Sequence, residues 1–287
     1  MLHQVLDRIR ELAAHGKPGS LERSLMHAYA GCLSEDQLVL AAIELLPADQ
    51  EIRSVVVSHL RRLKQETSYC GSLDELGSRL LELGPADRKL TVRIDSMLSQ
   101  FYTSFSAQTR KLVLERWIAR GTAGATSRWL KAMAGDAHLL DIDLIVKCWL
   151  ATNHSMAAAL VAKRADPDVL RPHLPDFVER CGEGWTVGRA YIRAHPFSDE
   201  CWERLRSKLP ATYLYVCAKV QRTINDDEAV SLVRAQADTD WPGTDQVGLA
   251  IWSVGQMKMY AALEEIRVSL SGISDAISKS FVKFGSS

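Results

Sequence analysis

The sequence is poor in the two residues that most often interrupt helices. Nine of its 287 residues are proline and 17 are glycine. Leucine and alanine, both strong helix formers, together make up roughly a quarter of the chain. Few helix breakers and many helix formers favour helix over strand.

The chain also lacks an excess of charge of either sign. Its 35 basic residues balance 35 acidic residues, and 47% of all residues are apolar. A disordered chain would be less apolar and more charged, and a protein that binds nucleic acid over its whole surface would be strongly basic. Both classes are therefore disfavoured. The length exceeds what one compact core usually covers, so we expect two cores or an elongated array.

No apolar run is long enough to span a membrane, which takes roughly 18 residues. The closest stretch, 141–151, is interrupted by Asp143 and Lys147, and the first ten residues carry charges rather than an apolar signal-peptide core. The six cysteines include no Cys-x-x-Cys pair, which favours free thiols over a disulfide framework or zinc site. We therefore expect a soluble, cytoplasmic protein without a membrane partner.

The usual catalytic patterns are missing as well. None of the eight histidines is followed by another three or four residues later, and there is no His-Glu-x-x-His. The sequence contains no Gly-x-Ser-x-Gly elbow, phosphate-binding loop or dinucleotide fingerprint. We expect no metal and no cofactor, and a non-enzymatic protein is favoured. A catalytic site assembled from remote helices stays an open alternative.

What the sequence does contain is the helical period, repeated along almost its whole length. One example is the set Leu90, Ile94, Leu98, Phe101 and Phe105, which places apolar side chains on one face of a helix. Prolines lie between such stretches rather than inside them. The chain is therefore predicted to be all-α.

An internal repeat with an offset of 38 residues connects two of these stretches. The segment 34–38 (Ser-Glu-Asp-Gln-Leu) is echoed at 72–76, and 44–49 (ending Pro-Ala-Asp) is echoed at 82–87. A helix pair of this length cannot bury both of its apolar faces alone, so the repeat predicts stacked neighbours.

Each copy of the repeat predicts the same local structure. A capping box, Ser34 with Gln37 in one copy and Ser72 with Glu75 in the other, is expected to open the first helix. Proline is expected at the first position of the second helix, at 47 and 85. The core positions that follow also align, and the pairs are Ile52 with Leu90, Val56 with Ile94, and Leu60 with Leu98.

Near the C-terminus the sequence resembles the HEAT-type repeat family. Small and apolar residues precede Gly255, and an Ala-Leu helix start follows at 261–263. The turn 256–259 has neither the Asp nor the Arg that HEAT units normally carry there. The resemblance implies a right-handed α-solenoid of stacked antiparallel helix pairs. We expect a single array over 1–287, with a weak break near 121–126 or 182–184.

Charge is distributed unevenly along the chain. The segment from Arg88 to Lys131 has nine basic and two acidic residues, whereas that from Asn225 to Asp245 has six acidic residues and one basic residue. Aromatic residues, Trp129 among them, are interleaved with the basic residues. Two interpretations of the basic segment stay open. The charges are solvated outer helix faces above an aromatic core, or they form a groove that meets an acidic partner.

These observations predict a helical-repeat scaffold or adaptor that binds a protein partner with an acidic surface through its concave side. The alternative is a nucleic-acid-binding protein, similar to the HEAT-like DNA glycosylases that cradle a duplex, which would use residues 88–131 on phosphates. The candidate partner-binding residues are Arg110, Lys111, Arg116, Arg120, Arg128, Trp129 and Lys131.

Overall fold

A computed structural model describes residues 1–14, 18–64, 68–83, 87–239 and 244–270, apart from the side chains at 238, 239, 244 and 245. Within these ranges every regular element is a helix, which confirms the all-α prediction. None of the helices there combines the length and the apolar character that crossing a membrane requires. The chain forms two compact units, Met1–Leu140 and Asp141–Ser287.

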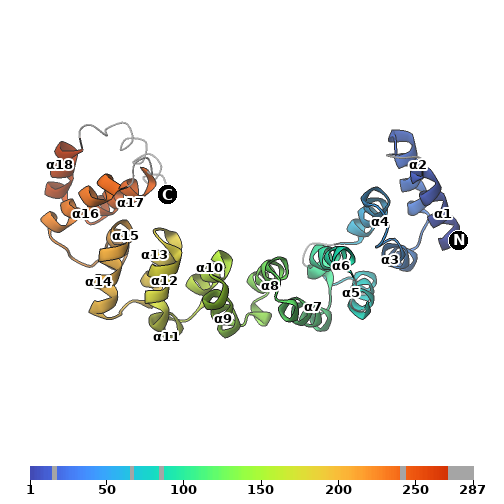
Figure 1. The fold of residues 1–287 in the computed structure, drawn as a ribbon, viewed down its shortest axis with the longest axis horizontal. Helices are drawn as coiled ribbons and strands as arrows, with labels where there is room; N and C mark the ends of the chain where they lie inside the picture. The colour runs from blue at the N-terminus through green and yellow to red at the C-terminus, as the bar shows by residue number, and fades with distance from the viewer. Residues whose placement is uncertain (15–17, 65–67, 84–86, 240–243, 271–287) are drawn as a thin grey trace. The chain divides into compact units, whose positions relative to one another are not determined.

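In the first unit, consecutive helices pack in pairs, and several of them also pack on a helix of a neighbouring pair (Figure 1). Helix α3 contacts both α4 and α5, α5 contacts both α6 and α7, and α2 contacts α4. The helices are α1 (Leu2–Ala13), α2 (Ser20–Gly31), α3 (Glu35–Glu44), α4 (Gln50–Leu63), α5 (Gly71–Glu82), α6 (Arg88–Phe101), η1 (Tyr102–Ser104), α7 (Ala107–Arg120), α8 (Ala123–Gly135) and η2 (Ala137–Leu139).

The second unit is built in the same way. Helices α10, α13, α15 and α17 pack in this order, each on the next, while α12 packs on α14 and α16 on α18. The helices are α9 (Ile142–Thr152), α10 (Ser155–Arg164), α11 (Pro167–Leu170), η3 (Arg171–His173), α12 (Leu174–Cys181), α13 (Trp185–Ala194), α14 (Asp199–Lys208), α15 (Pro210–Val220), α16 (Asp226–Thr239), α17 (Thr244–Gln256) and α18 (Tyr260–Ser269).

The first predicted capping box is present, but the second is wrong. Ser34 accepts a hydrogen bond from the Gln37 amide, and the Gln37 side chain accepts one from the Ser34 amide. Helix α5 instead begins at Gly71, one residue before Ser72. Ser72 therefore lies inside the helix, where its backbone cannot adopt the extended cap conformation. Its hydroxyl donates to Glu35 Oε2 at 2.9 Å and so connects α5 to α3.

Aspartate, rather than proline, marks the start of the second helix in each copy. Helix α4 begins at Gln50 with Asp49 as its N-cap, so the prediction of Pro47 at the first helical position is wrong. Pro47 lies in the preceding turn, and Pro85 lies outside the described residues. Asp87 caps α6 by accepting from the Leu90 amide at 2.9 Å. The repeat therefore aligns the two N-caps.

The aligned core positions are equivalent in the structure. Val56 and Leu60 of α4 are fully buried, as are Ile94 and Leu98 of α6. Burying a side chain of this size stabilises a fold by about 1.5–3 kcal/mol. The same residues of the repeat therefore perform the same packing role in both copies, as predicted.

Both positions at which the sequence suggests a break lie inside a unit and act as tight turns. Gly121 ends α7 with a φ of +59°, and Thr122 caps α8, which packs on α7. Gly182 and Gly184, with φ of +65° and +146°, connect α12 to α13. A positive φ favours glycine because it has no Cβ. The single array over 1–287 stays a prediction.

The different roles of the two repeat-related serines can be tested by substitution. We expect Ser34→Ala to lower the free energy of unfolding by about 1 kcal/mol, because the Gln37 amide at the start of α3 loses the side-chain oxygen that caps it. Ser72→Ala should lower it by less than about 0.5 kcal/mol, because only an exposed hydrogen bond is lost. Urea unfolding of the full chain, followed by circular dichroism, measures both. Equal losses would contradict the assignment of the cap to Ser34 alone.

Candidate functional site

The basic segment of the first unit directs several of its cations inward. Asp95 of α6 is 1% exposed, and it forms ion pairs with Arg120 and with Arg116, both on α7. The Arg116 pair separates Nε from Oδ1 by 3.7 Å. A carboxylate in this position would lose its hydration, so it needs cationic partners. The two arginines neutralise it and join α6 to α7.

A second buried carboxylate engages Arg110. Arg110 Nη1 lies 2.9 Å from Asp136 Oδ2, and the Asp136 side chain is 9% exposed. The neighbouring Tyr102 ring stacks on Trp117 with ring centroids 5.9 Å apart. Burial and the negative charge of Asp136 raise the pKa of Tyr102, so its hydroxyl stays protonated. This cluster is a packed part of the core.

The seven candidate residues therefore do not form one mixed cationic and aromatic surface. Trp129 is 4% exposed and lies in the core of the first unit, so it offers almost no surface to a partner. Lys111 and Lys131 are exposed and Arg128 is partly exposed. The aromatic residues of this segment fit the interpretation in which they build the core.

Asp95 should be more important for stability than the exposed cations around it. We expect Asp95→Asn to lower the free energy of unfolding by about 2 kcal/mol, because two partly buried arginines lose their counter-charge. The matched control Lys111→Ala, on the same helix as the two arginines, should change it by less than about 0.5 kcal/mol. Thermal and urea unfolding of the full chain measure the difference. Similar values for the two variants would show that the ion pairs contribute nothing to folding.

Two histidines face each other between α2 and α4. The rings of His27 and His59 lie 5.7 Å apart, centroid to centroid, and His59 is 8% exposed. Burial, followed by the positive charge of Arg62 and by His27, lowers the pKa of His59. The Nε2 atom of His59 has no hydrogen-bond partner among the described residues. His59 therefore folds in its neutral form.

The neutral state of His59 predicts how stability depends on pH. The unfolded chain binds a proton at His59 near pH 6.5, whereas the folded chain resists it. Unfolding therefore takes up a proton and becomes easier as the pH falls through about 6.5. In His59→Gln this part of the decline should disappear, whereas His138→Gln, at an exposed position, should keep it. Urea unfolding at several pH values checks this, and an unchanged decline in His59→Gln would contradict it.

In the second unit a polar pocket of about 310 Å³ opens between α14, α15 and the start of α16. The Arg222 guanidinium covers the Trp202 ring, with 4.4 Å from Cζ to the ring centroid. Such a cation–π contact holds the arginine over the ring. The pocket is lined by Asp199, Trp202, Glu203, Arg206, Tyr213, Arg222, Thr223, Ile224 and Glu228.

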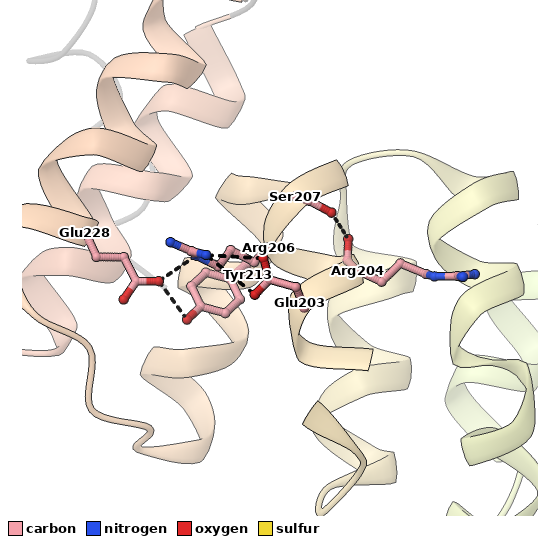
Figure 2. Close-up of polar contacts among 6 residues, drawn as sticks. All are labelled: Glu203, Arg204, Arg206, Ser207, Tyr213 and Glu228. Atoms are coloured by element: carbon pink, nitrogen blue, oxygen red, sulfur yellow. Dashed lines mark hydrogen bonds and ion pairs between the residues drawn. The ribbon is translucent and has the colours of Figure 1, made fainter. Parts of the chain in front are cut away.

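The charged groups of this pocket largely satisfy one another (Figure 2). Arg206 lies between Glu203 and Glu228, at 3.2 Å and 2.7 Å. The Tyr213 hydroxyl donates to Glu228 at 3.3 Å, and burial raises its pKa so that it stays a donor. Arg204 points away from this network (Figure 2). The network connects α14, α15 and α16, so we interpret it as structural.

A different surface of the second unit presents side chains that the core does not use. Trp185 of α13, Tyr215 of α15 and Trp252 of α17 form a row across three helices packed in this order. Their ring centroids lie 5.1 Å and 6.1 Å apart. Lys219 Nζ lies 5.8 Å from the Tyr215 centroid and 5.1 Å from that of Trp252. With Arg189 on α13, these residues define the aromatic–cationic face.

The aromatic–cationic face is open to solvent, and its Tyr215 ring packs against the backbone of α13 at Gly188. Trp185 is 57% exposed, Arg189 and Lys219 are exposed, and Tyr215 and Trp252 are partly exposed. A Cβ at Gly188 would lie 2.9 Å from the Tyr215 ring. Only glycine therefore lets this ring lie directly against α13.

Charge is segregated among the helices of the second unit. Helices α10, α13 and α15 contain no Asp or Glu, and α17 contains one acidic residue, in its first turn. The acidic residues concentrate on α12, α14, α16 and α18. Near the face, Glu183 accepts hydrogen bonds from the Ala211 and Thr212 amides at the start of α15. The aromatic–cationic face therefore has a positive character.

Sequence reasoning missed this surface, although a signal is present. An aromatic residue is followed by a cation four residues later at Trp185/Arg189 and again at Tyr215/Lys219, 30 residues on. Side chains four apart share one helix face. The signal is weak because only the packing of α13 on α15 shows that the two pairs adjoin.

Within the described residues, no group of three or more His, Cys, Asp or Glu side chains is placed to hold a metal ion. The described part of the chain has many helices that pack on their neighbours. This arrangement is compatible with a helical repeat. Comparisons with protein-family models, with curated proteins and with solved structures find no match to this chain.

Proposed function

We propose that this chain is a non-enzymatic helical-repeat protein that binds a protein partner through its aromatic–cationic face. The helix pairs would stack as a right-handed, HEAT-like α-solenoid, and the protein would act in the cytoplasm. The observation that carries the proposal is the row of Trp185, Tyr215 and Trp252, which stays accessible although each helix that bears it is packed on its neighbours.

The composition of the face supports a protein partner. Trp, Tyr and Arg are the residues enriched at the centres of protein interfaces. Trp and Tyr bury large areas at low cost in conformational entropy. Trp185 alone keeps more than half of its surface accessible. Burying such a side chain on binding gives about 25 cal/mol per Å² of apolar area.

The nucleic-acid alternative, which depends on the segment 88–131, has less support. Arg110, Arg116 and Arg120 are engaged with Asp136 and Asp95, so their charge is largely compensated within the first unit. The exposed Lys111, Lys131 and the partly exposed Arg128 stay candidates for a second contact.

A capture experiment with a matched pair of charge reversals tests the proposed function. Full-length protein is used to recover a partner from lysate of the source cells. Lys219→Glu should reduce recovery of that partner by about tenfold, because it places a negative charge in the face. Lys208→Glu, the same reversal at another exposed lysine, on α14, should retain it.

Two outcomes would contradict the proposal. Equal recovery by both variants would remove the aromatic–cationic face from the interaction. Recovery that nuclease treatment abolishes would replace the protein partner with nucleic acid.

A further inference from the structure

We infer that the aromatic–cationic face binds an acidic, proline-containing segment in the polyproline II conformation, with an Asp or Glu at every third residue. This inference rests on the proposed function, because it specifies the partner of the same surface. It follows from three properties of the face: the spacing of its helices, its one-sided charge and its fixed aromatic rings.

The spacing of the helices sets the repeat of the ligand. Arg189 and Lys219 lie on α13 and α15, which pack on each other, and packed helix axes are about 8–10 Å apart. A polyproline II helix rises about 3.1 Å per residue with three residues per turn, so every third side chain returns to the same side after about 9 Å. An extended β-strand alternates its side chains, so its third residue would point away.

The charge of the face selects acidic residues at these positions. Helices α13 and α15 contain no acidic residue, so a carboxylate that meets Arg189 or Lys219 finds no like charge on either helix. Exposed Lys163 on α10, which packs on the other side of α13, adds further positive charge. Opposite charges placed in this way fix the register of a ligand more than they add affinity.

The aromatic rings supply apolar contacts between the charges. Gly188 lets Tyr215 lie against α13, and the Trp185 ring meets it edge-on at 82°. Lys219 is held near both Tyr215 and Trp252, so few side chains need to be ordered on binding. Proline-rich segments dock on such aromatic surfaces because their backbone is already ordered.

The face fits a nucleic acid less well. One strand of B-DNA places a phosphate every 3.4 Å or so. About three phosphates would therefore fall within the spacing of about 8–10 Å between two packed helices. The face offers one cation on α13 and one on α15 within the row. The lower charge density of a segment with one acid in three residues matches this arrangement.

Two peptides of identical composition test the register. The first is acetyl-(Glu-Pro-Pro)₄, and the second has its four glutamates together followed by eight prolines. With fluorescein-labelled peptides and the full chain, anisotropy titration at low ionic strength should show about tenfold tighter binding of the first. Equal or tighter binding of the clustered peptide, or no binding of either, would overturn the inference. Tighter binding of a twelve-residue oligothymidylate would assign the face to nucleic acid instead.

Three variants locate the binding on the face. Lys219→Glu should weaken binding of the first peptide by about tenfold, and the control Lys208→Glu by less than about twofold. Gly188→Ala should weaken it by about fivefold without changing any charge, because the new Cβ displaces the Tyr215 ring. Trp185→Ala provides the same test at an exposed position if Gly188→Ala does not fold, as judged by circular dichroism. Equal affinities for Lys219→Glu and Lys208→Glu would overturn the inference.

The two experiments fail independently. If capture of a protein depends on Lys219 while neither peptide binds, the proposed function stands and the segment type is wrong. If the peptide binds in register while no protein is captured, the ligand chemistry stands and the adaptor role is wrong.

Discussion

Each helix pair of this protein has more apolar surface than its two helices can cover for one another, and the pairs must therefore pack on their neighbours. Helix α3 contacts α5 as well as α4, and α15 contacts α13 and α17 as well as α14. The core is consequently distributed along each unit, with buried positions such as Leu60 and Leu98 recurring from pair to pair.

The same packing decides which charges face outward. In the first unit, Asp95 and Asp136 are buried and require Arg116, Arg120 and Arg110 as partners. Three of the nine basic residues of the segment are therefore engaged within the fold. In the second unit the acidic residues concentrate on some helices and leave α13 and α15 without any. A net charge of zero therefore conceals a positively charged surface, and local placement rather than the total sets the field that a partner meets.

Aromatic residues show how the environment assigns different roles to one residue type. Trp117 is 1% exposed and packs under Tyr102, whereas Trp185 is 57% exposed beside Tyr215. Residue type alone does not separate the two, because both are tryptophans on helices. The difference arises because Trp185 lies in the first turn of its helix, on the side opposite to its buried neighbours Val187 and Ala190.

The sequence by itself determined the all-α class, the helix period and the equivalence of Val56 and Leu60 with Ile94 and Leu98, because these depend on residues close together in the chain. It placed one capping box correctly at Ser34, but it could not tell that Ser72 would lie inside a helix. Only the tertiary structure decided that Arg120 turns toward Asp95, that Trp129 joins the core, and that Trp185, Tyr215 and Trp252 form one row. The physical reason is that burial and ion pairing depend on contacts between distant segments, which no local pattern specifies.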